Sequence, residues 1–368
     1  MYYNTEIIQM ACFNKEKWRK IAMKPKPYGD PEKLVFGRTF TEHMYTIRYS
    51  EGKGWHDGKI EPYKPFVLDP AACVLHYSQE IFEGLKAYKS TNDRILLFRP
   101  EQNARRLNRS ARKLCMPELP EEIFLNAVKE LVLLDQDWIP DAPGTSLYIR
   151  PTMIATEPFL GVSPAKEYLF YIIMSPVGPY FKSGFNPVSI YVEDELVRAV
   201  VGGVGDVKTG GNYAASLLAG VKAEEKGFYQ VLWLDAKEHR YVEEVGAMNV
   251  FFVFGEKVVT PMLTGSILPG ITRDSVIKLA QELGIELEER RISFDEVLEG
   301  IKTGELTEMF GSGTAAVISP VGHLYYKDKD YYINNNKVGK LTKSFYDHLV
   351  DIQLGRAEDK LGWSVEVK

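Results

Sequence analysis

One lysine stands among glycines in the stretch Gly202–Tyr213, which reads Gly-Gly-Val-Gly-Asp-Val-Lys-Thr-Gly-Gly-Asn-Tyr. Three glycines precede Lys208 and two follow it, and a helical pattern begins at Ala214. Glycine lets a loop adopt positive φ angles and approach another molecule closely. The spacing fits neither a phosphate-binding P-loop nor a dinucleotide fingerprint. The stretch therefore indicates either a plain turn with a solvated lysine or a lysine that attacks a carbonyl, as lysines do with pyridoxal phosphate.

Several further short motifs accompany this lysine along the chain. They are His76-Tyr-Ser78, Phe82-Glu-Gly-Leu-Lys86, Leu97-Phe-Arg-Pro100, Leu147-Tyr-Ile-Arg-Pro151, Glu244-Val-Gly-Ala-Met-Asn249, Leu268-Pro-Gly270 and Phe310-Gly-Ser-Gly-Thr314. With the lysine stretch, they resemble the class IV aminotransferases, specifically the branched-chain amino-acid aminotransferases. The resemblance covers residues 34–355 and rests on the combination of motifs, because each one alone is short.

The resemblance implies that Lys208 forms the Schiff base with pyridoxal 5'-phosphate and, once freed by the substrate, moves the substrate's α-proton. Glu244 matches the carboxylate that keeps the cofactor's ring nitrogen protonated, and Tyr213 matches the phenol that hydrogen-bonds its phenolate oxygen. Glu243 should face the other way on the same strand and lie in solvent, because side chains alternate along a strand. Lys86 is expected to be solvated or structural.

Phosphate binding requires backbone N–H groups such as those at a helix start. The Leu-Pro-Gly motif should present the N–H groups of Ile271 and Thr272 there, and residues 311–314 should form a second loop that carries the Thr314 hydroxyl. Each motif alone is more often a plain turn. The resemblance adds Arg99 as a phosphate-binding arginine. A solvated helix face is expected for the arginines that follow it, namely Arg105, Arg106, Arg109 and Arg112.

The resemblance also implies an apolar, aromatic substrate pocket. Arg150 is expected near the acidic side chain of the glutamate co-substrate. Val162 matches a position that the family contributes to the neighbouring subunit's site, which implies a homodimer. The aromatic residues assigned to the pocket are Phe36, Tyr77, Phe82, Tyr148 and Tyr180.

The expected reaction is transamination of L-leucine, L-isoleucine and L-valine with 2-oxoglutarate by a ping-pong mechanism. The alternatives are a D-amino-acid aminotransferase, an aminodeoxychorismate lyase, or a non-catalytic protein that binds phosphorylated ligands. The chain departs from mammalian members at Ala316 and Ser319, where they have a Cys-x-x-Cys pair, and at Ala247, where they have Thr. Thiol regulation and one hydroxyl near the cofactor ring are therefore in doubt.

Composition argues against several other classes of protein. The formal net charge of −5 provides no basic face for nucleic acid. Cys12, Cys73 and Cys115 match no zinc or disulfide spacing, and no apolar run approaches the length of a membrane span. We therefore expect a cytoplasmic protein without metal, membrane or nucleic-acid binding.

A chain of 368 residues exceeds the usual size of one hydrophobic core, which favours two domains. We expect an N-terminal arm (1–33), a smaller domain (34–174), a link rich in proline and glycine (175–187) and a larger domain (188–368) that carries Lys208. The resemblance implies an α+β, fold-type IV architecture, with an N-terminal α/β sandwich and a C-terminal pseudo-barrel. Strands are expected at 39–49, 96–98, 145–155, 168–174, 188–192, 230–235, 247–254 and 257–260, helices at about 100–114, 121–135, 214–226, 271–283, 294–303 and 341–354, a hairpin at 324–333 and a polar turn at 52–62.

Overall fold

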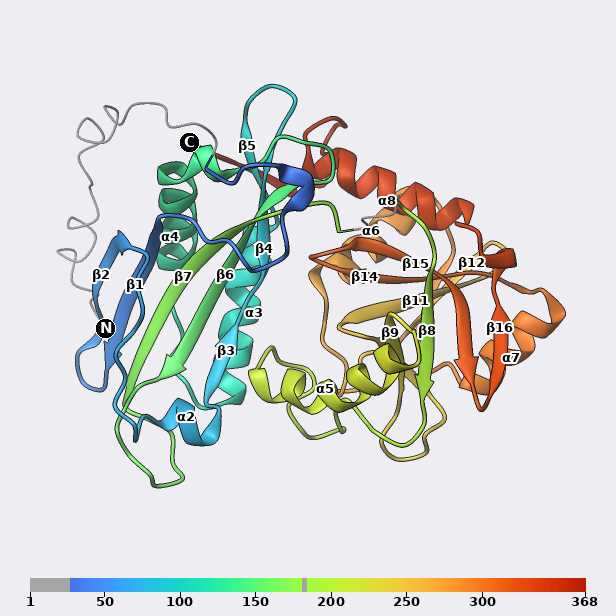
Figure 1. The fold of residues 1–368 in the computed structure, drawn as a ribbon, viewed down its shortest axis with the longest axis horizontal. Helices are drawn as coiled ribbons and strands as arrows, with labels where there is room; N and C mark the ends of the chain where they lie inside the picture. Colours follow the sequence, from blue (N-terminus) through green and yellow to red (C-terminus); the bar gives the residue numbers. More distant parts are fainter. Residues whose placement is uncertain (1–26, 181–183) are drawn as a thin grey trace. The chain divides into compact units, whose positions relative to one another are not determined.

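The computed structural model describes residues 27–180 and 184–368. Residues 1–26, most of the expected N-terminal arm, lie outside the described residues. The chain divides into two compact units (Figure 1). The first contains the described residues up to Pro179 together with Ser364–Lys368, and the second runs from Tyr180 to Trp363.

The first unit is an antiparallel sheet with two long helices packed against it. The strand order is β17-β5-β4-β6-β7-β1-β2, and β3 pairs with β6 beside this path. Its strands are β1 (His43–Ser50), β2 (Gly54–Pro62), β3 (Glu80–Phe82), β4 (Leu85–Lys89), β5 (Ile95–Phe98), β6 (Ser146–Ala155), β7 (Glu167–Val177) and β17 (Ser364–Val367). Its helices are η1 (Pro31–Lys33), α2 (Cys73–Tyr77), α3 (Pro100–Lys113), α4 (Glu121–Leu134) and η2 (Gln136–Trp138).

The two long helices form where the sequence pattern places them. Pro100 occupies the first turn of α3, where a missing N–H is tolerated. In α4, apolar residues at helical spacing, such as Phe124, Val128 and Leu131, are fully buried in the core of this unit. The face that α4 buries is therefore apolar, whereas the buried face of α3 also contains Asn103, Arg106 and Asn108.

The second unit is built around a closed sheet. Strands β10, β9, β8, β15, β14 and β11 pair in that order, and the pairing of β10 with β11 closes the ring. Strands β12, β13 and β16 extend it, so the expected pseudo-barrel is confirmed. Its strands are β8 (Val188–Glu193), β9 (Gln230–Leu234), β10 (Val242–Val245), β11 (Met248–Phe254), β12 (Lys257–Pro261), β13 (Leu287–Arg290), β14 (Leu306–Gly313), β15 (Val317–Tyr326) and β16 (Lys329–Tyr332). Its helices are α5 (Gly210–Glu225), α6 (Ile271–Glu282), α7 (Phe294–Thr303), η3 (Asn334–Asn336) and α8 (Lys340–Gln353).

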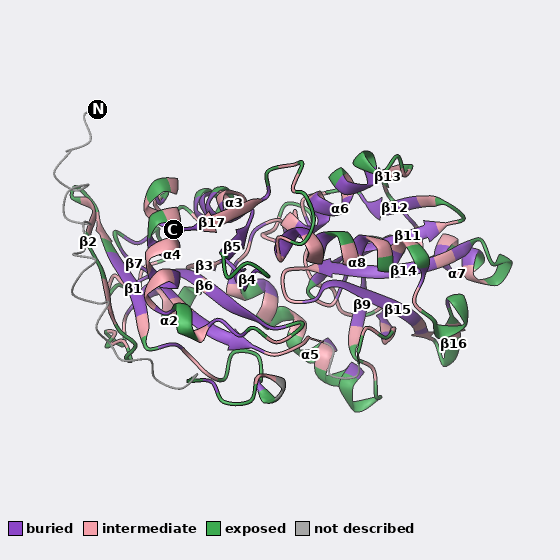
Figure 2. Ribbon diagram, turned by 90° about the horizontal axis from the view of Figure 1, so that it is seen from above, coloured by how far each residue is buried: buried purple, intermediate pink, exposed green. Residues whose placement is uncertain are grey.

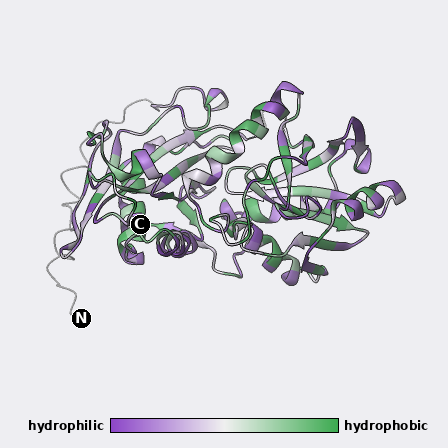
Figure 3. Cartoon of the chain, turned by 90° about the horizontal axis from the view of Figure 1, so that it is seen from below, coloured by the Kyte–Doolittle hydropathy of each residue, from purple (hydrophilic) through white to green (hydrophobic). Residues whose placement is uncertain are grey.

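Burial follows this architecture. The strands of both units are largely buried, whereas the β16 hairpin end is exposed (Figure 2). Figure 3 colours the chain by hydropathy, and both hydrophilic and hydrophobic residues occur along its helices, as is typical of helices that pack one face on a core. Within residues 27–180 and 184–368, no helix combines the length and apolarity that crossing a bilayer would need.

The expected helices and most expected strands are present, and the differences have identifiable causes. The polar turn expected at 52–62 is wrong, because residues 54–62 pair with β1 as the exposed edge strand β2. The C-terminal residues 364–367 form β17 on the edge of β5, which places them in the first unit, whereas the sequence analysis assigned them to the second domain. Both strands are recognisable only from their pairing partners, since neither is an apolar run.

Candidate active site

Lys208 lies directly before α5, on a loop held by side chain to backbone hydrogen bonds. Its Nζ donates to the Tyr213 hydroxyl at 2.7 Å. Asn212 Nδ2 donates to the carbonyl oxygens of Val204 at 2.7 Å and Val207 at 3.0 Å. Because Asn212 fastens the helix start to the loop, α5 begins at Gly210 rather than at the expected Ala214. The amine and the phenol are therefore presented together from one loop and helix junction.

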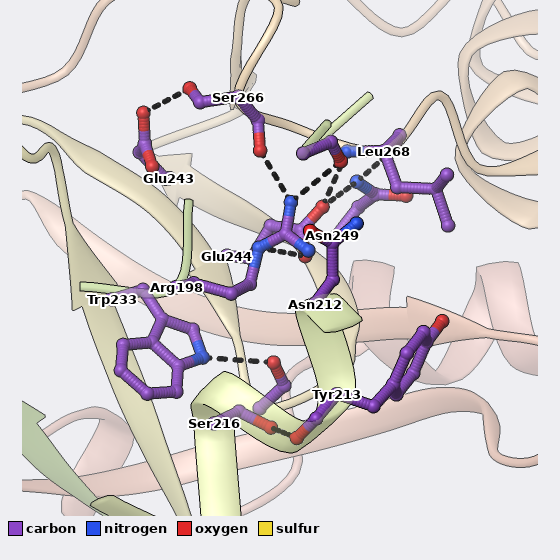
Figure 4. A network of polar contacts seen from close by, with 12 residues as sticks. Arg198, Asn212, Tyr213, Ser216, Trp233, Glu243, Glu244, Asn249, Ser266 and Leu268 are labelled. Carbon is purple, nitrogen blue, oxygen red and sulfur yellow. Dashed lines mark hydrogen bonds and ion pairs between the residues drawn. The ribbon is translucent and has the colours of Figure 1, made fainter. Parts of the chain in front are cut away.

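Glu244 is a buried carboxylate on β10, surrounded by donors. Its Oε2 lies 3.0 Å from Nε of Arg198, and its Oε1 accepts from the backbone N–H of Leu268 at 2.8 Å and from Asn249 Nδ2 at 3.3 Å (Figure 4). Burial raises the pKa of Glu244, while Arg198, the Leu268 N–H and Lys208 act in the opposite direction. A carboxylate with this set of donors can stay anionic and hold a proton on a heterocyclic nitrogen.

The expectation that Glu243 faces solvent is wrong. Glu243 is only 5% exposed and accepts a short hydrogen bond from the Ser266 hydroxyl. Alternation along β10 does turn it away from Glu244, but in this closed sheet both faces of the strand are covered. Burial raises the pKa of Glu243 to about 7. The site region therefore contains two buried carboxyl groups rather than one.

The predicted phosphate-binding turn leads into α6, with Gly270 as its N-cap and Ile271 and Thr272 in its first turn. A Cβ added at Gly270 would lie 2.0 Å from Oδ1 of Asn249, so only glycine fits there. The first turn of a helix directs N–H groups and positive potential outward, which suits a phosphate dianion. Asn249 Nδ2 also donates to the Leu268 carbonyl at 2.8 Å, which ties this turn to β11, the strand that pairs with the Glu244 strand β10.

The expected loop at residues 311–314 is wrong for its first three residues. Residues 311–313 are the end of β14, where Gly311 pairs with Val250 and Ser312 with Asn249. Glycines in a strand often mark a close approach of other groups. A Cβ at Gly311 would indeed lie 2.9 Å from the Met248 side chain. Thr314 lies in the turn that follows, two residues beyond the partner of Asn249.

The second unit thus contains the donor set that a phosphorylated pyridine aldehyde requires. Lys208 supplies an amine, Tyr213 a phenol, Glu244 a buried carboxylate, and the start of α6 a phosphate cradle. Lys208 is also near enough to Glu244 to lower its pKa. These residues fit pyridoxal phosphate.

Arg99, in the first unit, has a backbone conformation that arginine rarely adopts. It is the N-cap of α3, with φ at 50° and ψ at 44°, and its side chain is 3% exposed. A non-glycine residue in the left-handed region costs free energy and is concentrated at functional sites. The geometry therefore supports a specific role for this arginine.

Several of the predicted substrate residues lie together on the first unit. The rings of Phe36 and Tyr148 contact edge to face at 4.7 Å between centroids. The Arg150 guanidinium lies 4.6 Å from the Phe82 ring centroid, and its Nη2 donates to the Tyr148 hydroxyl at 3.0 Å. A Cβ at Gly84 would lie 2.1 Å from this hydroxyl, so Gly84 makes room for Tyr148. We call Phe36, Phe82, Tyr148 and Arg150 the aromatic wall.

The other predicted substrate residues lie elsewhere. Tyr77 donates a short hydrogen bond to the Leu160 carbonyl and so supports the loop of Val162, which is 88% exposed. Tyr180 belongs to the second unit, where its ring lies 6.4 Å from that of Tyr229. Tyr77 and Val162 thus belong to one loop region of the first unit, and Tyr180 belongs to the second unit.

Two sequence expectations about cations of the first unit need correction. The four arginines of α3 do not form one solvated face, because Arg106 is buried and pairs with Glu83 through Nε to Oε1 at 2.7 Å and Nη2 to Oε2 at 2.8 Å. Arg109 is half-buried, and only Arg105 and Arg112 are exposed. Of the two alternatives expected for Lys86, solvated or structural, the solvated one is wrong, because Lys86 is buried on β4 and burial lowers its pKa to about 8.

Sequence reasoning missed Arg198, Asn249 and Ser266, which surround Glu244 and Glu243. Arg198 lies on an irregular loop, so no periodicity singles it out. Asn249 ends one of the quoted motifs and could have been weighed as a buried polar residue in an apolar strand. Ser266 could have been found only from the fold.

Cysteines and possible metal ligands do not gather at this site. Cys73 and Cys115 are free thiols, and Cys12 lies outside the described residues. Among residues 27–180 and 184–368, no three His, Cys, Asp or Glu side chains converge as metal ligands would.

Comparisons with known proteins agree with this geometry. The family model for amino-transferase class IV matches residues 80–324. Branched-chain-amino-acid aminotransferase 2 of Bacillus subtilis is 56% identical over 344 residues, covering 94% of each chain, and branched-chain-amino-acid transaminase 1 of the same strain is 53% identical over 96% of this chain and 99% of its own length.

Solved structures show the same fold. The branched-chain amino acid aminotransferase of Escherichia coli superimposes with a TM-score of 0.75 at 28% identity, covering 89% of this chain and all of that one. The branched-chain amino acid aminotransferase of Thermobaculum terrenum, solved in its PLP-form, has a TM-score of 0.72 at 24% identity, with coverage of 89% and 99%. With the family model matching most of its length and relatives identical at more than half of their positions, this chain belongs to the class IV aminotransferases.

Proposed function

We propose that this protein transaminates L-leucine, L-isoleucine and L-valine with 2-oxoglutarate, giving branched-chain 2-oxo acids and L-glutamate, with pyridoxal 5'-phosphate as cofactor. The relatives named as branched-chain-amino-acid aminotransferases support the reaction. The observation that carries the mechanism is the contact of Lys208 Nζ with the Tyr213 hydroxyl, beside the buried Glu244. When bound, the cofactor supplies an aldehyde for the amino group and a ring that accepts electrons from the substrate's α-carbon.

In this proposal, Lys208 is both the nucleophile toward the cofactor's aldehyde and the base that moves the α-proton. A short loop before a helix suits this double role, because the amine needs a fixed position in both steps. Tyr213 lies within hydrogen-bond distance of the amine and orients it. Glu244 holds the proton of the ring nitrogen, and the Arg198 contact favours its anionic form.

We assign the cofactor's phosphate to four groups. The N–H groups of Ile271 and Thr272 belong to the first turn of α6, where the helix dipole favours an anion. Thr314 would add a hydroxyl, and Arg99 would add a positive charge from its unusual position at the start of α3. Charge-assisted contacts to phosphate are about twice as strong as neutral ones, so Arg99 is expected to contribute most.

The aromatic wall suits a pocket that must accept two kinds of side chain. Burying a leucine side chain against it is worth roughly 1.5–3 kcal/mol. The carboxylate of glutamate needs a cation or donor in the same place. Arg150, which contacts both Phe82 and Tyr148, can supply that charge for the second half-reaction. Tyr77, Val162 and Tyr180 stay proposed as further substrate contacts.

Two measurements on the purified protein test this function. The bound cofactor should make the protein yellow, and L-leucine with 2-oxoglutarate should yield stoichiometric L-glutamate. A colourless protein that binds phosphate esters would instead be a non-catalytic binder. Turnover of D-alanine at a comparable rate would indicate the D-amino-acid aminotransferase, and pyruvate release from aminodeoxychorismate would indicate the lyase.

A homodimer is part of this proposal. The loop around Val162 exposes Phe159, Leu160 and Val162, with 47%, 60% and 88% of their surfaces accessible, which is unusual for a cluster of large apolar side chains. The resemblance implies that Val162, on this loop, contributes to the site of the neighbouring subunit. Light scattering after size-exclusion chromatography gives the mass directly, and Val162→Asp should shift it toward the monomer.

We also propose a cytoplasmic location. Both described cysteines are free, which suits a reducing compartment. Cell fractionation with activity assays tests this assignment.

A further inference from the structure

We propose that Arg198 is a positioning residue of this site, whose guanidinium holds the Glu244 carboxylate, the Lys208 loop and the segment before α6 in one arrangement. The inference rests on the proposed function and adds a residue to it. Arg198 lies on the loop between β8 and α5, ten residues before Lys208 in the chain.

Three separate segments converge on this one side chain. Nε of Arg198 lies 3.0 Å from Oε2 of Glu244. Its Nη2 donates to the Gly205 carbonyl at 2.9 Å and makes a short hydrogen bond to the Ser266 carbonyl. Figure 4 shows the guanidinium between Glu244 and the Ser266 carbonyl. Glu244 belongs to β10, Gly205 to the lysine loop, and Ser266 to the segment that leads into α6.

The backbones around Arg198 are packed too closely for this arrangement to be a loose surface contact. A Cβ on Gly205 would lie 2.3 Å from the Ser266 carbonyl oxygen and 2.5 Å from the Ala199 side chain. The side chains of Arg198 and Glu244 are 9% and 4% exposed. A buried ion pair at this depth is weak evidence for stability by itself, and a role in fixing geometry is the better attested use.

The direct contact of Arg198 is with Glu244, while its positive charge also lowers the pKa of the neighbouring Glu243. Oε1 of Glu243 accepts from the Ser266 hydroxyl, which in turn lies 2.9 Å from the Thr264 hydroxyl. Within the part of the chain that the structure describes, the guanidinium forms its ion pair with Glu244. Asn249 supports the same carboxylate from the other side and links it to the Leu268 carbonyl.

Arg198 therefore holds three parts of the site together. They are Glu244, which is proposed to hold the ring-nitrogen proton, the loop of Lys208, and the segment that leads into α6. Losing this support should affect the rate of the chemical steps more than the affinity for leucine, since the aromatic wall is untouched. A hydrogen bond or ion-pair contact to a charged group typically corresponds to a factor of about 10–100.

A double-mutant cycle on the holoenzyme tests the proposal. We expect Arg198→Met to lower kcat by about 10–100-fold, with the KM for leucine changing by less than about threefold. When Arg198→Met is added to E244Q, kcat should fall by less than about threefold relative to E244Q alone, because the carboxylate that Arg198 contacts is already replaced by a neutral amide. Equal factors in both backgrounds would overturn the proposal.

Two readouts separate positioning from a merely structural role. The pH at which the absorbance of the bound cofactor changes should move upward in Arg198→Met, because a positive charge near a proton-binding group has been removed. Arg198→Lys keeps the charge and should restore part of the rate and of this shift, although a single amine cannot reproduce the guanidinium's fork. An absorbance titration identical to the parent's in both variants contradicts the proposal.

Arg106→Met is the matched control, because it removes an equally buried arginine from an ion pair with Glu83 in the other unit. It should lower the melting temperature without moving the absorbance titration. If Arg198→Met does not fold, Arg198→Lys in both backgrounds gives the same cycle. A parent enzyme without leucine-dependent turnover would contradict the proposed function, while cofactor affinity and the absorbance titration would still test Arg198.

Discussion

The two regions that carry the proposed site are built differently. Around Glu244 and Lys208, the polar groups are buried or half-buried and are held by hydrogen bonds and an ion pair. Glu244 accepts from Leu268 and Asn249 and pairs with Arg198, and Lys208 donates to Tyr213. The aromatic wall is instead held by ring contacts and one hydrogen bond, and Phe36 is half exposed. Proton transfer needs atoms fixed within a few tenths of an ångström, whereas a pocket that takes both leucine and glutamate needs a surface that adapts. The polar region is therefore suited to the chemical steps, and the aromatic wall is suited to substrate selection.

The largest effect should come from the centre of the polar region. We expect Lys208→Ala to fold but to lose turnover, because the loss of its general-base role alone is worth about 10²–10⁴-fold and the covalent attachment is lost as well. Absorbance spectra and glutamate release measure both losses. Lys222→Ala, which changes an exposed lysine on α5, is the control. A yellow and active Lys208→Ala protein would place the nucleophile elsewhere.

Glu244→Gln should retain the cofactor but lower kcat on the order of 10²–10³-fold, as removal of one preorganised electrostatic partner does. A neutral amide cannot hold the proton on the ring nitrogen. Steady-state kinetics beside Glu225→Gln, an exposed control on α5, measures the effect. Unchanged turnover in Glu244→Gln would remove this residue from the mechanism.

Arg150→Met sharpens the comparison from the side of the aromatic wall. The half-reaction with 2-oxoglutarate should slow by about 10–100-fold, the value of one charged hydrogen bond, while the half-reaction with leucine changes little. Single-turnover absorbance follows each separately, so leucine is the internal control. Equal damage to both would show that Arg150 serves the α-carboxylate or the scaffold.

Arg99→Ala should weaken cofactor binding by about 10–100-fold and Thr314→Ala by less than about 10-fold, as expected for charged and neutral hydrogen bonds. Titration of pyridoxal phosphate into each apoprotein measures the affinities. Arg105→Ala, which removes an exposed arginine of α3, is the control. Affinities equal to the parent's would exclude both residues from the phosphate site.

The smallest effect concerns stability rather than rate. Burial raises the pKa of Glu243 from 4.5 to about 7, with Glu244 and Asp235 adding to the rise and Arg198 and the Ser266 hydroxyl opposing it. The folded state therefore binds a proton that the unfolded state releases, and stability falls as the pH rises from 4.5 to 7. Glu243→Gln should flatten this dependence by on the order of 1–3 kcal/mol. Urea unfolding at several pH values measures the free energy of unfolding of the parent and of Glu243→Gln. An equal decline with pH in both proteins would contradict the raised pKa of Glu243.

The sequence predicts the long helices, the buried strands and the closed sheet, because apolar periodicity and family motifs are both strong there. It also singles out Lys208 and Tyr213 as site residues, and the structure adds the hydrogen bond between them. It fails at Glu243, since strand alternation cannot reveal that a closed sheet covers both faces. It fails at Arg106 and Arg198 for a related reason, because a buried cation is recognisable only with its acid, and Glu83 and Glu244 are distant in sequence.

The pairing of β17 with β5 has a consequence for biosynthesis. The edge strand β17 of the first sheet is made of residues 364–367, which follow the whole second unit in the chain. During translation, β5 is made before the second unit, yet its β17 partner is made only after it. An unpaired edge strand can pair with other chains. A nascent chain of this protein therefore carries an open sheet edge while the whole second unit is being made.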